Sequence, residues 1–396
     1  MDIYHLILIL PKESNIELEG RDFINQQTIN VFKYMRKYNI VGVMSGTSMD
    51  GLDIAHVSLE EQAEGKWSYS INAATTVAYE EKWRLRLSKL RHQNSMIFHK
   101  TDRFYGQFIG ENIKQFLSDN NLEANLISSH GHTVFHQPEN NVTVQIGDGN
   151  SIYAFTGIPT VTNFRALDVI LGGEGAPLVG VADQMLFGEY DMCLNLGGFA
   201  NISADINGNR VAYDVGPCNI ILNRIAREFD KEYDEGGEIA AKGAIDYDLL
   251  TELNEIEYYS YEPPKSLGRE WISSHFWGNV RNSHATKEDK MKTLVDHIAQ
   301  QVANNVEDLS SGDASGKRLL VTGGGAFNDT LISHIRTHTE AEVVVPESTL
   351  VDYKEALAFA LLGILRVQNK TNVFNVATGA KSSSVSGSLY GDFSNL

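Results

Sequence analysis

The chain has 396 residues, which exceeds the usual size of one domain, so two lobes of similar size are the first expectation. Hydrophobic residues make up 42% of the chain and charged residues 21%, proportions that are typical of a globular protein with an ample core. The net charge of -18 argues against nucleic acid or an anionic membrane as the main partner, because phosphate-rich surfaces need Lys and Arg to displace their counterions.

Cysteine usage and hydropathy bound the location. Two cysteines, Cys193 and Cys218, are too few for a disulfide framework or a zinc cluster, so we expect buried, inert thiols in a reducing, cytoplasmic compartment. No apolar run approaches the roughly 20 residues that span a bilayer. Residues 4–11 are apolar but lack the basic flank of a signal peptide. We therefore expect residues 1–38 to form an N-terminal extension outside the core, which begins near Lys37.

Residues 40–59 read as two strands that flank a polar, glycine-rich tip at 45–51, a pattern that predicts a β-hairpin. Glycines let the backbone approach a ligand, and the amides and hydroxyls of such a tip can hold phosphate oxygens. Asp50 and Asp53 are candidate ligands of a magnesium ion. The tip is not a P-loop, because no Gly-Lys-Ser/Thr is present and a strand follows it. Taken alone, the segment is more often an ordinary tight turn than a phosphate-binding tip.

The next segments extend this first unit. Residues 66–79 predict strands that add to the hairpin. Residues 101–120 place large apolar side chains at helical spacing, which predicts an amphipathic helix capped by Thr101 or Asp102.

A histidine-rich segment follows. The apolar residues 126–127 predict a short strand that runs into a loop carrying His130, His132 and His136. A zinc site is less favoured than a substrate-binding loop or a satisfied polar turn, because the segment has no helical His-Glu-x-x-His pattern and no nearby cysteine.

Residues 143–146 and 151–155 bracket the sequence Gly-Asp-Gly-Asn, which predicts a second pair of strands joined by a turn. Arg165 then precedes a glycine-rich loop at 172–177 and would suit a ligand carboxylate or phosphate held by two hydrogen bonds. A structural ion pair with Asp168 is the alternative for the same arginine.

The opening pattern then returns. Residues 191–205 again read as strand, glycine-rich tip and strand, and residues 211–219 form a strand that ends at the acidic Asp214 before a helix. Residues 319–328 predict a buried parallel strand, a triple-glycine loop and the start of another helix, an arrangement suited to an adenosine lying on bare backbone. Two such hairpins suggest two related lobes that face one nucleotide across a cleft.

The chain carries, in this order, the segments GVMSGTSMDGLD, SHGHTVFHQP, NFRALDVILGGEGAPLV, LNLGGFANIS, YDVGPCN, PPKSLGREW, VTGGGAFN and EALAFALLG. Together they resemble the anhydro-N-acetylmuramic acid kinases, which belong to the actin and hexokinase superfamily. The resemblance covers residues 39 to about 390. It implies an α/β fold with two ribonuclease-H-like lobes and ATP in the cleft between them. We expect residues 39–165 to form the first lobe and residues 166–396 the second, with the C-terminal helix packing back on the first.

The family opens the 1,6-anhydro ring of 1,6-anhydro-N-acetylmuramic acid with water and transfers the ATP γ-phosphate to O6. The resemblance therefore implies ATP and Mg²⁺ as cofactors, with Asp50 and Asp53 as metal ligands, and Asp214 as the base that accepts the proton of the water. The residues that match the family's nucleotide loops are Gly46, Thr47, Ser48, Met49, Asp50, Gly51, Leu52, Asp53, Gly197, Gly198, Asn201, Gly323, Gly324, Gly325 and Asn328. The residues expected at the sugar are His130, Gly131, Thr133, Arg165 and Glu355, with Arg165 holding the lactyl carboxylate.

Some positions depart from the family pattern. Asn163 stands where Asp is common, His132 where Gln is common, and Cys218 where Gly is common, while residues 179–183 replace a different run. These changes fall around the expected sugar pocket and put details of substrate contact in doubt more than the reaction class.

Two alternatives stay open. One is an ordinary ATP-dependent sugar kinase that phosphorylates a free hydroxyl and needs no hydrolytic water. The other is a non-catalytic ATP-binding sensor of the same fold, although a retained base at Asp214 argues against it. The resemblance also implies a homodimer, with no nucleic acid and no membrane among its partners.

Overall fold

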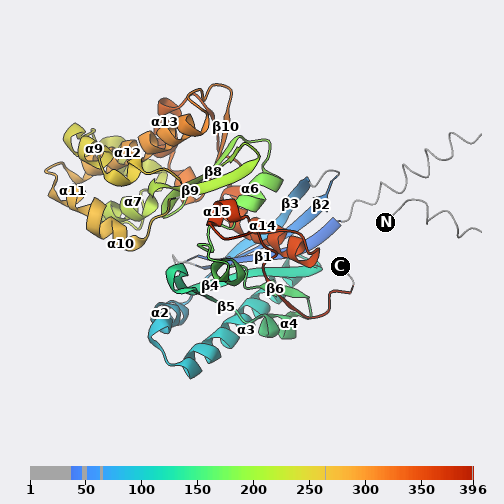
Figure 1. Cartoon of the computed structure of the whole chain (residues 1–396). Coiled ribbons are helices and arrows are strands. Elements are labelled where there is room, and N and C mark those ends of the chain that lie inside the picture. The colour runs from blue at the N-terminus through green and yellow to red at the C-terminus, as the bar shows by residue number, and fades with distance from the viewer. Residues whose placement is uncertain (1–36, 47–50, 63–65, 264, 395) are drawn as a thin grey trace, which may run out of the picture. The chain divides into compact units, whose positions relative to one another are not determined.

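The computed structural model describes residues 37–46, 51–62, 66–263, 265–394 and 396. Its strands form two sheets (Figure 1). The strands of the first sheet are β1 (Lys37–Ser45), β2 (Gly51–Glu61), β3 (Trp67–Ala78), β4 (Leu126–Gln137), β5 (Val142–Ile146), β6 (Thr160–Thr162) and β12 (Ser388–Tyr390). The strands of the second sheet are β7 (Met192–Leu196), β8 (Phe199–Ile206), β9 (Asn209–Pro217), β10 (Arg318–Thr322) and β11 (Glu342–Val344).

The two sheets repeat one topology. In the first, the order is β12-β6-β4-β1-β2-β3, where β1, β2 and β3 are antiparallel and β4 and β6 run parallel to β1. In the second, the order is β11-β10-β7-β8-β9, again an antiparallel meander extended by two parallel strands. A meander followed by parallel strands on the side of its first strand is the ribonuclease-H-like sheet, so the predicted duplicated fold is confirmed.

The helices cover these sheets. They are α2 (Glu81–Lys89), α3 (Ser95–Asp119), α4 (Gly149–Thr156), α5 (Ala166–Ile170), α6 (Gly180–Leu186), α7 (Asn219–Ala226), α8 (Glu238–Lys242), α9 (Tyr247–Asn254), α10 (Arg269–Trp271), α11 (Trp277–Asn282), α12 (Lys287–Leu309), α13 (Asp329–His338), α14 (Ser348–Val367) and α15 (Asn375–Thr378). None of the helices within the described residues is both long enough and apolar enough to cross a membrane.

Successive side chains of a strand point to opposite faces of the sheet, and here both faces are buried. The strands are therefore nearly continuous apolar runs in the sequence. In β1, Ile40 and Met44 pack with residues of α14, whereas Val41 and Val43 pack with residues of α3. Cys193 of β7 packs in the α14 cluster, and both cysteines are buried free thiols, as expected. A Val, Ile or Met side chain of β1 contributes about 1.5–3 kcal/mol when it is fully buried.

Helix α14 lies directly on the first sheet because glycine and small residues remove side chains from the contact. A Cβ at Gly42 of β1 would lie 1.9 Å from the carbonyl oxygen of Ala356, and one at Gly363 would lie 2.5 Å from Cβ of Ser128. Ser128 Oγ donates a hydrogen bond to the carbonyl of Phe359. The first sheet therefore holds α14 at backbone distance.

Three local predictions were wrong. The predicted helix at 101–120 begins earlier, at Ser95, because Asn94 provides the N-cap by accepting a hydrogen bond from Ile97 N. The segment predicted as a second strand at 151–155 is α4, since Asp148 caps a helix by accepting from Ser151 N. The histidine segment is part of the long strand β4 and not a loop, because β5 pairs with it.

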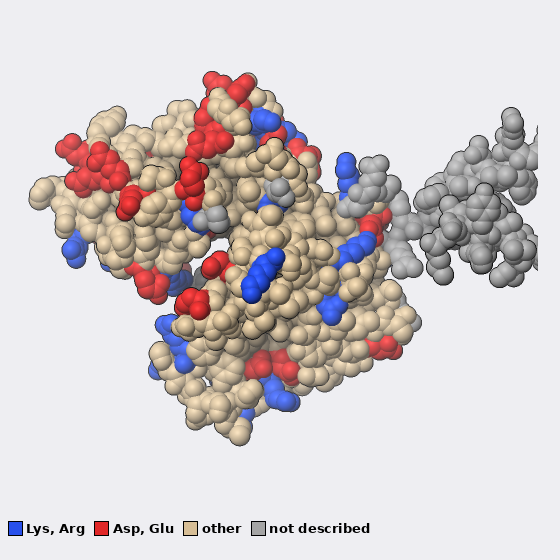
Figure 2. Space-filling view, in the orientation of Figure 1, with Lys and Arg blue, Asp and Glu red and all other residues tan. Residues whose placement is uncertain are grey.

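The predicted lobe limits at residues 39–165 and 166–396 stay a prediction. Strand β1 begins at Lys37, so residues 37 and 38, which the sequence analysis placed in the extension, belong to the first sheet. Two C-terminal segments, α14 and β12, pack on or pair with strands of that first sheet. Figure 2 shows acidic side chains gathered on this face over α9 and beside α13.

Candidate functional site

Four polar side chains occupy one row across the second sheet. Thr322 of β10 pairs with Asn195 of β7, Asn195 pairs with Asn201 of β8, and Asn201 pairs with Asp214 of β9. A shift of register between Ala200 and Asn201 produces this alignment. The topology therefore brings the predicted base next to the predicted nucleotide loops, although they lie far apart in the sequence.

Residues 258–267 hold both the backbone and the carboxylate of Asp214. The backbone N–H of Leu267 donates to Asp214 Oδ2 at 2.9 Å, and Asp214 N donates to the carbonyl of Lys265 at 3.1 Å. Tyr258 Oη donates to the carbonyl of Asp214 at 2.7 Å. Within the described residues, no hydrogen bond reaches Asp214 Oδ1. Burial raises the pKa of Asp214 to about 6, and the Leu267 amide offsets part of that rise.

The glycine loops of the second sheet converge at the ends of β7 and β10. Gly323 has φ of +82°, and a Cβ there would lie 2.5 Å from Asn195 Oδ1 and 2.9 Å from the carbonyl carbon of Leu196. Only glycine fits that approach. Cys218 N and Asn219 N donate to the carbonyls of the Gly198 and Gly197 tip at 2.9 and 3.1 Å. The tip of β7 and β8 is thereby tied to the start of α7.

Other predicted nucleotide residues have defined places. Asn328 caps α13, since its Oδ1 accepts from Leu331 N at 2.9 Å. Gly324 and Gly325 form the short 3₁₀ turn Gly324–Phe327 before that helix. Gly198 has open space where a Cβ would stand. The structure thus assembles these loops on one end of the sheet, while their contact with a nucleotide stays a prediction.

The first hairpin is formed as predicted by β1 and β2. Thr47, Ser48, Met49 and Asp50 lie outside the described residues, and Gly46 and Gly51 flank them. The side chain of Leu52 is fully buried in the core shared with α3, so only its backbone faces the hairpin. Asp53 Oδ1 accepts a hydrogen bond of 2.6 Å from Thr76 Oγ1.

A buried network of hydrogen-bonded hydroxyls lies at Ser45, where β1 ends before the hairpin tip. Ser45 Oγ lies 2.9 Å from His132 Nδ1 and accepts a hydrogen bond of 2.7 Å from Tyr79 Oη. Tyr79 Oη lies 2.5 Å from Tyr105 Oη. Burial lowers the pKa of His132 to about 4, so its ring is neutral in this network. The departure at His132 therefore supports the first hairpin through its hydrogen bond with Ser45.

Arg165 is positioned by a histidine. Its Nε donates to His130 Nε2 at 2.8 Å, and its Nη1 donates to the carbonyl of Gly175 at 2.5 Å. His130 Nδ1 lies 2.9 Å from the carbonyl of Gly131, which fixes the tautomer that leaves Nε2 as an acceptor. Burial and the nearby Arg165 hold the pKa of His130 well below its usual range.

The alternative ion pair of Arg165 is not formed. Asp168 accepts instead from Gly175 N at 2.8 Å and from Thr378 Oγ1 at 2.7 Å. Within the described residues no hydrogen bond reaches Arg165 Nη2. Burial lowers the pKa of Arg165 to about 10, which leaves a protonated guanidinium at neutral pH. The arrangement suits the binding of a carboxylate.

Glu355 and Lys354 are neighbours on α14 with different partners. Burial raises the pKa of Glu355, and the nearby Arg165 cation offsets part of the rise. Lys354 is buried and pairs with Asp183 of α6, Nζ to Oδ1 at 2.7 Å. A cavity of about 20 Å³, room for one water, separates this pair from Asn195 and Asn201.

The remaining sugar-pocket residues are part of β4. Gly131 has φ of +74°, and a Cβ there would lie 2.2 Å from the carbonyl oxygen of Ile146 in β5. Thr133 Oγ1 accepts a 3.3 Å hydrogen bond from Gln145 Nε2. Their contact with a sugar stays a prediction.

Several supporting residues were not predicted. Leu267, which lies in the segment PPKSLGREW that carries part of the family resemblance, holds Asp214 through its backbone N–H. No local signal indicated the role of Tyr79 under the first hairpin. Lys354 stands between Asp352 and Glu355 in α14, so no local signal indicated that it pairs with Asp183. Figure 2 shows the surface hollowed where the half that carries α7 and α10 meets the half that carries α2 and β4.

Known proteins match this chain over most of its length. The family model described as "Anhydro-N-acetylmuramic acid kinase" matches residues 38–392. A protein of that name from Francisella tularensis subsp. novicida is 32% identical over 374 residues, covering 88% of this chain and 97% of its own. Another from Clostridioides difficile is 32% identical over 372 residues, covering 88% and 97%. A third, from Actinobacillus pleuropneumoniae serotype 7, is 33% identical over 375 residues, covering 90% and 100%.

Proposed function

Because the chain belongs to the anhydro-N-acetylmuramic acid kinase family, we propose that it opens the 1,6-anhydro ring of 1,6-anhydro-N-acetylmuramic acid and phosphorylates O6 with ATP. The products are N-acetylmuramic acid 6-phosphate and ADP, in the recycling of cell-wall peptidoglycan sugar. The observation that carries the assignment of the reacting group is the position of Asp214, a carboxylate with a raised pKa at the edge of converging glycine loops.

Asp214 acts as the general base in this proposal. The water oxygen forms a bond to the anomeric carbon while the bond from that carbon to O6 breaks, and the water proton passes to Asp214. O6 then forms a bond to the γ-phosphorus as the bond to the ADP oxygen breaks. With a pKa of about 6, Asp214 is mostly ionised at neutral pH and still basic enough to accept a proton.

Arg165 provides recognition of the lactyl carboxylate. Its Nε and Nη1 are already fixed by His130 and Gly175, so the guanidinium is oriented before the sugar binds. Nη2 then supplies donors to the carboxylate, a charge-assisted contact. Glu355 lies close enough to influence Arg165 electrostatically, and its carboxylate can accept hydrogen bonds from sugar hydroxyls.

ATP is held by the glycine loops, and Mg²⁺ accompanies it in our proposal. Asp53 stands at the start of β2 beside the hairpin tip, and its carboxylate with the hydroxyl of Thr76 forms an oxygen-rich environment that suits Mg²⁺. Asp50, the other proposed ligand, lies outside the described residues. When bound, Mg²⁺ supplies neutralisation of phosphate charge.

The decisive experiment is an ADP-release assay with 1,6-anhydro-N-acetylmuramic acid, N-acetylmuramic acid and N-acetylglucosamine as separate substrates. We expect turnover only with the anhydro sugar, and we expect Asp214→Asn to lower it by about 10²–10⁴-fold, the usual contribution of a general base. Asp119→Asn, an exposed position at the end of α3, is the matched control. Turnover confined to the open sugars would assign an ordinary sugar kinase, and ATP binding without turnover would assign a sensor.

Two further features belong to the proposal. We propose a homodimer, as the family resemblance implies, which sedimentation or light scattering would test. We also propose a cytoplasmic location, which rests on the use of ATP and on two free buried thiols, Cys193 and Cys218.

A further inference from the structure

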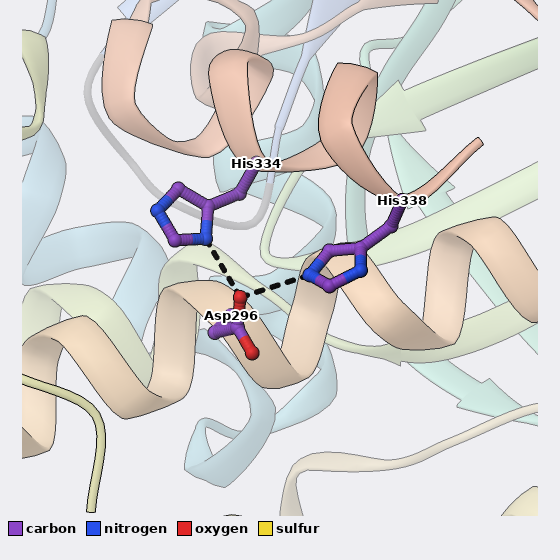
Figure 3. Close-up of side chains that lie close together, drawn as sticks. All are labelled: Asp296, His334 and His338. Atoms are coloured by element: carbon purple, nitrogen blue, oxygen red, sulfur yellow. Dashed lines mark hydrogen bonds and ion pairs between the residues drawn. The ribbon is translucent and has the colours of Figure 1, made fainter. Parts of the chain in front are cut away.

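Helices α12 and α13 bring together three side chains that the proposed reaction does not use. Figure 3 shows Asp296 of α12 between His334 and His338 of α13. His334 Nδ1 lies 2.7 Å from Asp296 Oδ1, and His338 Nε2 lies 2.9 Å from the same oxygen. Within the described residues, this is the one group of three His, Cys, Asp or Glu side chains whose ligand atoms converge, all within 4.8 Å of one another.

The spacing of these residues matches that of known metal ligands. His334 and His338 stand four residues apart, so both project from one face of α13, as the two histidines of His-Glu-x-x-His sites do. Asp296 completes a set of two imidazoles and one carboxylate, which leaves one position of a tetrahedral ion open to water.

The distances between the three ligand atoms can be compared with those of a tetrahedral site. In a tetrahedral zinc site with bonds of about 2.0–2.1 Å, neighbouring ligand atoms stand about 3.3 Å apart. The two present contacts of 2.7 and 2.9 Å would widen by roughly half an ångström. The two histidine nitrogens, which lie within 4.8 Å of each other, would stand at the same tetrahedral spacing after rotation about their side-chain torsions. Each neutral histidine needs only to carry its proton on the other ring nitrogen, and no oxidation or reduction is involved.

The surroundings also favour an ion. Asp296 Oδ2 accepts a 2.8 Å hydrogen bond from Gln300 Nε2, which orients the carboxylate as outer partners of metal ligands do. The side chain of Asp296 is 5% exposed, while those of His334 and His338 are 19% and 31% exposed. The carboxylate is therefore buried, and the two partly exposed histidines leave a route by which an ion can enter from solvent.

We propose that Asp296, His334 and His338 bind one divalent transition-metal ion, with Zn²⁺ as the best fitting, and that the ion clamps α13 to α12. This site is separate from the proposed nucleotide loops. With a rise of 1.5 Å per residue, His338 stands about 15 Å along α13 from Asn328, the cap that follows the triple-glycine loop. The ion is structural in this proposal: it fixes the helix that follows that loop, and the inference does not depend on the proposed reaction.

Isothermal titration of the metal-free full chain with Zn²⁺ tests the site. We expect one ion per chain and a rise of the unfolding temperature with Zn²⁺, because a ligand that binds only the folded state stabilises it. Mg²⁺, which prefers oxygen ligands, should give no effect that His334→Ala removes. Co²⁺ should give the visible absorption of a four-coordinate site.

Variants separate this site from all other histidines and carboxylates. His334→Ala and Asp296→Asn should each weaken Zn²⁺ binding tenfold or more and abolish the thermal shift. Asp296→Asn retains an oxygen that accepts from a histidine, so it keeps the metal-free fold while removing the charged ligand. His99→Ala, an exposed histidine on α3, should bind Zn²⁺ like the unaltered chain. Absence of Zn²⁺ binding, or unchanged binding by Asp296→Asn, overturns the proposal.

Discussion

At the level of single residues, the pKa of Asp214 determines how the proposed reaction depends on pH. The base is active when ionised, and burial raises its pKa to about 6, so kcat/KM should fall about tenfold per pH unit below that value. A pH profile of kcat/KM between pH 4 and 8 measures this limb. An inflection near pH 4 would mean that the carboxylate of Asp214 is solvated and not buried, and would contradict this prediction.

The same burial has a cost in stability. A carboxyl whose pKa is higher in the folded than in the unfolded chain destabilises the folded state as pH rises from about 4 to about 6. Asp214→Asn removes that buried charge and should raise the free energy of unfolding at pH 7.5 by about 1 kcal/mol, after allowance for partial exposure. Urea unfolding of both chains at pH 7.5 measures the difference. An equal or lower stability would show that Leu267 N compensates the charge fully.

Arg165→Gln tests recognition of the lactyl group. The variant loses a charge-assisted contact, so KM for 1,6-anhydro-N-acetylmuramic acid should rise about tenfold or more while KM for ATP stays unchanged. The sugar without a lactyl group, 1,6-anhydro-N-acetylglucosamine, should be affected much less. Arg281→Gln, an exposed position on α11, is the control. An equal loss with both sugars would mean that Arg165 supports the fold of the pocket and does not read the carboxylate.

At the level of elements, the contact between β1 and α14 depends on Gly42. A Cβ there would lie 1.9 Å from the Ala356 carbonyl oxygen, and backbone atoms on both sides cannot yield cheaply. Gly42→Ala should therefore lower the free energy of unfolding by about 3 kcal/mol. Gly278→Ala, where a Cβ meets open space inside α11, should leave stability equal or raise it by about 0.5–1 kcal/mol. Denaturant unfolding of both variants decides the matter, and similar effects would argue against close packing of α14.

At the level of the whole described chain, the buried ion pair of Lys354 and Asp183 joins α14 to α6. Burial lowers the pKa of Lys354, but the Asp183 carboxylate outweighs this and the net pKa is raised, so the amine is charged. Lys354→Met leaves Asp183 buried without its cation and should lower the free energy of unfolding by about 3–5 kcal/mol. The double variant Lys354→Met with Asp183→Asn should recover part of that loss. No recovery would show that the lysine acts by packing alone.

The sequence by itself determined most of the strands, the glycine loops and the family. These features depend on alternation of apolar residues and on short segments whose chemistry is local, such as the hairpin of β1 and β2 or the strand, loop and helix around Gly323. The limits of local patterns show at α4. There the sequence Gly-Asp-Gly-Asn predicts a turn between strands, but Asp148 caps a helix that packs on α3.

Only the tertiary structure decided which side chains meet. Sheet register sets Asp214 beside Asn201, and a hydrogen bond over a separation of 35 residues makes His130 the support of Arg165. Helix packing joins Asp296 to His334 over 38 residues. A sequence pattern reports which face of its own strand or helix a residue occupies. The pattern does not show which residue of another element will contact that face. Burial in a core constrains the size and polarity of a side chain but does not specify its partner.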